Sequence, residues 1–351
     1  MKFRRIEAPG RTIIVAGIDR RFTVFTAWFL HLWKQRFAAK PFLVAGAGSG
    51  DLAAPLLNSL AEPLQLPEKF LPLLWFLLRG RYGTIVFLNP DLRVTQKLRI
   101  AARLAGIKYR CGFAPLRRVT GLNLSLPFND ENHHYVHQLR TFFEYISGEK
   151  TTGWNAPEFP LAETRGVAGL PDEPFGIIAY NGDETESQYL EVQLKKLTNL
   201  MARSSHCVLI LRSRHLGRQA LTRLARGFSE VMTEHALAHT TLLMLPDEQT
   251  LVNLLRDAAW IAGTDTELLN VAALFATPAV AVFGPLNERV WQPFSVRTRA
   301  LTGEFACRPC TAYPGAVQCS NAVPWACLAG ASAELMAATL TAVLRRKRHV
   351  T

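Results

Sequence analysis

The feature that most constrains the fold is an alternation of short apolar runs with longer segments of helical spacing, which occurs twice along the chain. In the first half, the strand-like runs are residues 12–16, 42–45 and 84–88, and the helix-like segments are residues 22–36, 52–64 and 94–105. In the last of these segments the apolar positions share one helical face, at Leu98, Ala101, Ala102 and Ala105. Short, continuous apolar runs are typical of strands buried on both faces, and intervening helices connect parallel neighbours. The pattern predicts a parallel sheet covered by helices.

The same alternation starts again after residue 174. The expected strands are residues 175–180, 207–211, 242–245, 260–262 and 279–283, and the expected helices are residues 188–204, a segment ending at Arg226, 248–258 and 268–275. Residues 148–174 are rich in Gly, Pro, Thr and Glu and lack periodicity, which is typical of a linker. We predict an α/β protein with two Rossmann-like domains, residues 1–150 and 175–351, joined by residues 151–174. Ligands of such domains bind at the carboxyl ends of the strands.

The composition supports two folded domains. Of the 351 residues, 49% are hydrophobic and 19% are charged, which is enough apolar material for two cores and excludes a disordered chain. The longest apolar run, residues 70–78, is far shorter than the roughly 18 residues of a membrane-spanning helix. The basic N-terminus leads into the strand-like run at residues 12–16, unlike a signal peptide. We therefore expect a cytoplasmic protein.

The net charge of +12 favours anionic partners. No recognised nucleic-acid-binding motif is present, so phosphates or anionic lipids are the expected partners and nucleic acid is not. The densest basic run, residues 345–348, is interpreted first as a solvated tail and second as a segment attracted to a membrane surface. Peripheral contact with the inner face of the inner membrane is therefore a secondary expectation.

Several segments, in a fixed order, carry a resemblance to a known family. They are residues 79–88 (RGRYGTIVFL), residues 104–113 (LAGIKYRCGF), the helix start His134-Tyr135-Val136, and residues 245–285, which end in IAGTDTELLNVAALFATPAVAVFGP. Trp291, Pro293 and the pair Cys307 and Cys310 follow. Together they resemble the heptosyltransferases of glycosyltransferase family 9, which build the inner core of lipopolysaccharide. The resemblance implies a GT-B fold, in which two Rossmann-like domains face a cleft. It also implies inverting transfer from ADP-heptose, with an acceptor-side N-terminal domain and a donor-side C-terminal domain.

The segment Gly263-Thr264-Asp265-Thr266-Glu267 lies between an expected strand and an expected helix. Because free N–H groups at a helix start bind phosphate, we predict donor contacts here, at Thr264, Asp265, Thr266, Glu267, Leu268 and Asn270. Capping of the helix by Thr266 alone is the alternative. Asp265 and Thr266 match the family's Asp-Thr-Gly-Pro-x-His, whereas Glu267 and Asn270 replace its Gly and His. Glu267 would bring a carboxylate close to a diphosphate, which is unfavourable unless it contacts sugar hydroxyls.

A second donor segment follows the first strand of the C-terminal half. Tyr180-Asn181-Gly182-Asp183 stands where the family has His-Pro-Gly-Ala. Gly182 allows a ligand to approach the backbone, so we predict that Asn181 and Gly182 contact the donor, with a ligand-free tight turn as the alternative. The family's Lys on the donor phosphates has no counterpart in residues 185–189.

Inverting transfer needs a base that takes the proton of the acceptor hydroxyl. The family uses an Asp after the first strand, and here Arg21 aligns with it while Asp19 lies two residues earlier. We predict Asp19 as the base, with a solvated or ion-paired Asp as the alternative. Arg20 and Arg21 are predicted to bind an anionic glycolipid acceptor, because Arg pairs with phosphate in bidentate fashion. His134, which precedes the interdomain linker as a His does in the family, is expected to face the acceptor.

Four of the six cysteines are close together in the sequence, at Cys307, Cys310, Cys319 and Cys327. Four thiolates can bind one structural Zn or Fe ion tetrahedrally, and buried thiols beneath a loop are the alternative. With no open coordination position, such a site would be structural, and the transfer itself requires no cofactor.

Two further functions remain open at this stage. The departures at Arg21, at the missing Lys and at Asn270 are consistent with a catalytically divergent or inactive relative that serves in binding or assembly. The cysteine cluster alone favours a protein glycosyltransferase of the same fold.

Overall fold

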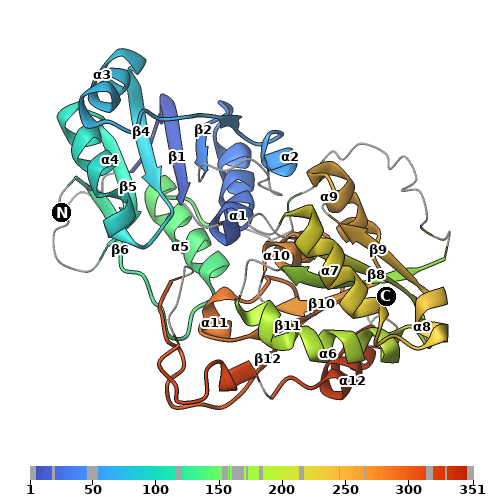
Figure 1. The fold of residues 1–351 in the computed structure, drawn as a ribbon. Helices are drawn as coiled ribbons and strands as arrows, with labels where there is room; N and C mark the ends of the chain where they lie inside the picture. Colours follow the sequence, from blue (N-terminus) through green and yellow to red (C-terminus); the bar gives the residue numbers. More distant parts are fainter. Residues whose placement is uncertain are drawn as a thin grey trace. The chain divides into compact units, whose positions relative to one another are not determined.

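The computed structural model describes residues 5–17, 20–45, 54–114, 121–151, 157, 159, 170, 173–181, 185–212, 217–244, 246–264, 266–313, 319–328 and 330–345. The chain divides into two compact units, Met1–Pro160 with Tyr313–Gly315, and Leu161–Ala312 with Ala316–Thr351. Each unit contains a six-stranded sheet with helices packed on it (Figure 1). Every described strand pair is parallel, as the uninterrupted apolar runs predict.

The sheet of the N-terminal unit has the order β3-β2-β1-β4-β5-β6. Its strands are β1 (Arg11–Gly17), β2 (Phe42–Ala45), β3 (Glu62–Pro63), β4 (Tyr82–Phe87), β5 (Tyr109–Phe113) and β6 (Leu124–Leu126). The chain builds from β1 outward through β2 to β3, then crosses to β4 on the other side of β1. Ile13 and Ile14 of β1 and Ile85 and Val86 of β4 are fully buried, so these two strands form the centre of the sheet.

The described helices of this unit are α1 (Arg20–Arg36), α2 (Ala54–Leu57), α3 (Phe70–Gly80), α4 (Leu92–Leu104) and α5 (Tyr135–Ser147). Helix α1 packs on α5 through a group of aromatic rings, Phe29, Trp33, Phe37, Phe142 and Phe143. Helix α3 packs on α4, whose expected apolar face is confirmed: Ala101 and Ala102 are fully buried in the core, and Leu98 and Ala105 pack against it.

The expected helix over residues 52–64 is wrong. Helix α2 covers only Ala54–Leu57, and the N–H groups of Leu60 and Ala61 both donate to the Leu57 carbonyl, which turns the chain. The next residues form the edge strand β3, where the Glu62 N–H donates to the Pro41 carbonyl at 2.9 Å. Because proline lacks an N–H, it is tolerated in a strand at the edge of a sheet, and Pro63 lies at such an edge.

The sheet of the C-terminal unit has the order β12-β11-β10-β7-β8-β9. Its strands are β7 (Phe175–Asn181), β8 (His206–Arg212), β9 (Thr240–Met244), β10 (Trp260–Thr264), β11 (Ala279–Phe283) and β12 (Thr298–Thr302). All five strands expected in this half are present, with ends that differ by at most two residues, and β12 is additional. Residues Phe175 to Tyr180 of β7 are all buried, which places this strand in the middle of the core.

The helices of the C-terminal unit are α6 (Thr185–Met201), α7 (Arg218–Ser229), α8 (Glu234–Ala238), α9 (Glu248–Asp257), α10 (Glu267–Leu274), α11 (Glu288–Trp291) and α12 (Ala333–Arg345), with a 3-10 turn at Ala326–Leu328. Helices α6 and α12 pack on each other and on β10, and their Leu194, Leu197, Met336 and Leu340 are buried in one core. Helix α10 packs against α9 and directly follows β10. Among the described helices, none is long and apolar enough to cross a membrane.

Close packing at the centre of this sheet generates a stability prediction. Gly176 of β7 pairs with Trp260 of β10, and a Cβ at position 176 would lie 1.8 Å from an atom of the indole ring. The buried Trp260 would have to move, so we expect Gly176→Ala to lower the free energy of unfolding by about 1–3 kcal/mol, measured by chemical denaturation. As a control, Gly227→Ala in α7 meets only the end of the Lys195 side chain at 3.4 Å and should preserve or raise stability. Equal losses in both variants would contradict the packing argument.

Candidate functional site

The carboxyl edge of the C-terminal sheet contains a topological switch point between β7 and β10. From β7 the chain proceeds to β8 and β9 on one side, and then returns to β10 on the other. Gly263 pairs with Ala179, so the ends of the two strands, Thr264 and Asn181, lie close together. Open α/β sheets bind ligands at such a point, because the loops after the two strands separate there.

Helix α10 begins at this edge and leaves two polar atoms unpaired. Thr266 is the N-cap residue, but its side chain makes no capping hydrogen bond. The Thr266 Oγ1 and Asn270 Oδ1 atoms are both buried, and neither has a hydrogen-bond partner among the described residues. The Asn270 amide nitrogen donates back to the Thr266 carbonyl at 3.3 Å. The Thr266 side chain therefore does not cap the helix in this structure, and a buried hydroxyl without a partner calls for an explanation such as a ligand.

A buried ion pair spans the switch point. Arg212, the last residue of β8, pairs in register with Asn181 of β7. Its Nη1 atom lies 3.6 Å from Oε2 of Glu267, the first residue of α10, and the two side chains are only 13% and 8% exposed. Because β8 and β10 flank β7, the Arg212 side chain has to cross the carboxyl end of β7 to reach Glu267. The positive charge of Arg212 offsets the negative charge of Glu267, which by itself would be unfavourable beside a diphosphate.

Sequence reasoning missed Arg212. In the local sequence, Arg212 is marked only as a cation that directly follows the apolar run 207–211. Its ion pair with Glu267 depends on the strand order, which the local sequence does not encode. Of the expected donor residues, Thr264 is fully buried. The Leu268 side chain is buried in the core, so only the backbone N–H of Leu268 could contact a ligand at the helix start. Gly182 and Asp265 lie outside the described residues.

The N-terminal sheet has a corresponding switch point between β1 and β4, which end at Gly17 and Phe87. The expected base, Asp19, follows β1 but lies outside the described residues. Arg20 and Arg21 form the first positions of α1, and their side chains are likewise outside the described part of the structure.

His134 has a structural role that the sequence did not predict. It is buried and is the N-cap residue of α5, where its Nδ1 atom accepts a hydrogen bond from the Val136 N–H at 3.1 Å. Its ring also packs edge-on against Phe25, with centroids 6.0 Å apart. These contacts account for the His at this position as a cap, and its expected contact with the acceptor remains a prediction.

The four clustered cysteines line one small cavity, together with Pro285, Asn321, Trp325 and Ala326. Cys310 donates to the Cys307 carbonyl at 3.3 Å, and the Trp325 N–H donates to the Cys319 sulfur at 3.2 Å. Burial and the neighbouring thiols raise the pKa of Cys310 and of Cys327, while Arg308 opposes this effect. In the described part of the chain, which includes all four cysteines, no group of three or more His, Cys, Asp or Glu side chains is placed to hold a metal ion. The expected structural metal is therefore not supported by these positions, although the four thiols line one cavity.

Arg308 attaches the cysteine-containing segment to the carboxyl edge of the sheet. Its guanidinium donates to the carbonyls of Gly284 and Leu286 at 2.6 and 3.0 Å and pairs with Glu288 at 3.0 Å. The Cys310 N–H donates to the Pro285 carbonyl at 2.8 Å. The turn that follows β11 is thus held in place by the segment that contains the cysteines.

Comparisons with known proteins agree with this architecture. The model of the family described as glycosyltransferase family 9 (heptosyltransferase) matches residues 92–320. This chain belongs to glycosyltransferase family 9. None of the curated proteins has a matching sequence.

Three solved structures illustrate the relationship of this family 9 chain to others. A family 9 glycosyl transferase from Veillonella parvula is 12% identical, with a TM-score of 0.75 over 98% of this chain and 100% of the other. E. coli ADP-heptose lps heptosyltransferase II is 14% identical, with a TM-score of 0.67 over 96% and 99%. The iron-containing dodecameric glycosyltransferase TibC from enterotoxigenic E. coli is 14% identical, with a TM-score of 0.55 over 99% and 79%. The fold is therefore GT-B, as the resemblance implied.

The unpaired hydroxyl of Thr266 generates a second stability prediction. Thr266→Val removes a buried acceptor that has no partner, so we expect the free energy of unfolding to stay unchanged or to rise. Thr277, equally buried nearby, donates to the Leu255 carbonyl at 2.8 Å, and Thr277→Val should cost about 1–3 kcal/mol. Denaturant titrations of both variants distinguish the two environments. A comparable loss in Thr266→Val would show that its hydroxyl already has a partner in the ligand-free protein.

Proposed function

We propose that this chain is an inverting glycosyltransferase that moves a heptose, or a related sugar, from ADP-heptose to a lipopolysaccharide core or a related anionic glycan. The observation that carries the proposal is the polar cluster at the β7–β10 switch point of a family 9 chain. There a buried cation from the end of β8 meets the N-terminus of α10, whose N-cap residue carries the unpaired hydroxyl, so two separate parts of the sequence come together.

The donor diphosphate is assigned to the start of α10. Helix N-terminal N–H groups attract phosphate oxygens, and the Thr266 hydroxyl can donate to one of them. Arg212 supplies a positive charge at the same edge, in place of the family's missing Lys. Asn181, Gly182 and Asp265 are proposed to complete this donor site, and Glu267, held by Arg212, is proposed to face the sugar hydroxyls.

The reaction requires a proton acceptor as well as a leaving-group site. We assign the base to Asp19, which takes the proton of the acceptor hydroxyl while that oxygen forms a bond to the anomeric carbon. The bond between this carbon and the diphosphate breaks at the same time, and ADP leaves with the electron pair, stabilised by Arg212 and the α10 N-terminus. Arg20, Arg21 and His134 are assigned to the anionic acceptor, and transfer of this kind needs no cofactor.

Two variants separate donor binding from turnover. The wild-type protein should bind ADP-heptose and transfer heptose to a lipopolysaccharide core acceptor, measured by calorimetry and by product mass spectrometry. Asp19→Asn should lower kcat by about 10² or more with nearly unchanged donor affinity. Arg212→Gln should instead weaken the binding of ADP-heptose about tenfold or more while leaving that of adenosine unchanged.

The outcomes also distinguish the competing function. A protein that binds ADP-heptose but transfers no sugar to any tested acceptor would be a divergent binding module. That alternative is consistent with Arg21 and Asn270, which stand where the family has its Asp and His. Absence of binding to ADP-heptose would refute the proposed donor.

A separate proposal concerns Cys307, Cys310, Cys319 and Cys327, which we propose bind one structural Zn or iron ion after loss of their thiol protons. The support is that all four line one cavity and that backbone N–H groups such as that of Trp325 already face sulfur. Iron is the metal named for TibC, so both metals are included. Coordination to a metal stabilises the thiolate form and so opposes the raised pKa of Cys310 and Cys327.

Elemental analysis of protein purified without chelators tests this site. About one equivalent of Zn or iron is expected, and the double variant Cys310→Ser/Cys327→Ser should lose it. Cys111→Ala, at a buried cysteine of the N-terminal unit outside the cluster, serves as the control and should retain the metal. Less than a tenth of an equivalent in the wild-type protein, with four titratable thiols, would contradict the proposal.

A further inference from the structure

Helix α3 presents an unpartnered apolar stripe to solvent. Leu71, Trp75 and Leu78 are 75%, 60% and 53% exposed, among the most exposed of the large apolar side chains described. Their spacing of four and three residues places them on one face of the helix. The opposite face is firmly anchored, because Leu73 and Leu77 are buried in the core of the N-terminal unit. The stripe therefore belongs to a rigid helix and is not a by-product of loose packing.

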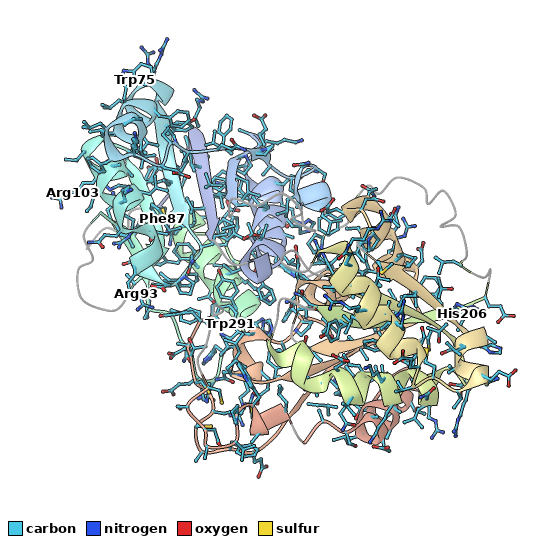
Figure 2. The ribbon with its side chains drawn as sticks, viewed as in Figure 1. Trp75, Phe87, Arg93, Arg103, His206 and Trp291 are labelled. Carbon is cyan, nitrogen blue, oxygen red and sulfur yellow. The ribbon has the colours of Figure 1, made fainter. Side chains whose placement is uncertain are left out.

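Scattered single apolar side chains are normal on a protein surface, but an aligned group on one helix indicates an interaction site. Within the N-terminal unit, Trp75 of α3 lies at the periphery (Figure 2). The N-terminal half of this protein thus carries a hydrophobic surface that the transferase chemistry does not use.

Cations flank the stripe at both ends. Lys69 immediately precedes α3, and Arg79 and Arg81 occupy its last turn and C-cap; all three are exposed. The Arg79 guanidinium lies 5.0 Å from the centroid of the Trp75 ring, so this charge is held directly beside the apolar side chains. Between residues 63 and 90 the only acidic side chain is Glu68. An apolar centre with a positive border is the complement of an anionic lipid headgroup layer.

We propose that the outward face of α3 docks on the surface of an anionic lipid bilayer. Leu71, Trp75 and Leu78 enter the boundary between headgroups and acyl chains, where Trp is favoured, while Lys69, Arg79 and Arg81 contact lipid phosphates. The helix lies in the plane of the surface, since no described helix is long enough to cross a bilayer.

The size of the stripe argues against a protein partner. A stable protein interface buries roughly 800 Å² on each partner, whereas three side chains on one helix form a narrow strip. A lipid surface requires no shape complementarity and responds to both the apolar area and the charge. This docking goes beyond the proposed transfer and does not depend on which sugar or acceptor is used.

Sedimentation of the full-length protein with lipid vesicles tests the proposal. Binding should be strong to vesicles of phosphatidylcholine with phosphatidylglycerol, weak to phosphatidylcholine alone, and reduced by salt. The triple variant Leu71→Ser/Trp75→Ser/Leu78→Ser should lower the partition coefficient at least about tenfold. Its control replaces three exposed valines of the C-terminal unit, Val192→Ser/Val231→Ser/Val296→Ser, and should bind as the wild type does.

A double variant that removes two of the flanking cations provides a second test. Lys69→Gln/Arg79→Gln should weaken binding to anionic vesicles roughly fivefold for each charge removed. Arg218→Gln/Arg223→Gln removes two exposed cations from α7 with the same change in net charge and should have a much smaller effect. Equal binding to neutral and anionic vesicles, or equal losses in variants and controls, would overturn the proposal. So would a wild-type oligomer that the stripe variant dissociates, in the absence of vesicle binding, because the stripe would then be a protein interface.

Discussion

The parallel pairing of β7 with both β8 and β10 is the constraint on which the donor-side unit depends. Each strand of such a sheet ends at the same edge, and the reversal of direction at β7 places the ends of β8 and β10 on opposite sides of one strand. Asn181, Arg212 and Thr264 are far apart in the sequence but adjacent at this edge for that reason alone. Close packing maintains the arrangement, because only glycine at position 176 leaves room for the Trp260 ring.

The electrostatics of this edge are balanced rather than simply positive. Arg212 is almost buried, and an isolated cation in that position would pay a large desolvation cost. Glu267 lowers that cost and fixes the guanidinium over the switch point. The same carboxylate reduces the net attraction of Arg212 for an anion, which leaves the N–H groups at the start of α10 as the main uncompensated positive feature. Under the proposed function, the pair would hold the guanidinium in a fixed position from which it both binds and orients the donor diphosphate.

The local sequence predicts a helix or strand correctly where burial alone determines it. It does not predict elements whose structure depends on pairing with distant parts of the chain. Strand β11, which is buried on both faces, has the bounds that its apolar run predicts, and so does the partly buried strand β2. Helix 52–64 was predicted from apolar content, whereas Pro63 pairs as an edge strand through a register set by β2. Local sequence does not predict helix α3, because the almost continuous apolar run of residues 70–78 does not show which face is buried. The family motif identified the α10 segment, but neither the ion pair with Arg212 nor the unpaired state of Thr266 can be deduced without the strand order.

The two unpaired oxygens of Thr266 and Asn270 would couple the folding of the protein to the binding of any ligand that pairs with them. In the ligand-free protein each such buried group costs about 1–3 kcal/mol relative to a hydrogen-bonded one. A ligand that binds only the folded state and pairs with these atoms recovers this cost, and at a concentration of 100 times its Kd it stabilises the fold by about 2.7 kcal/mol. The unfolded fraction falls accordingly, and with it the exposure of the chain to proteases. Under the proposed function, the cellular lifetime of the protein would therefore follow the supply of the sugar donor that pairs with these atoms.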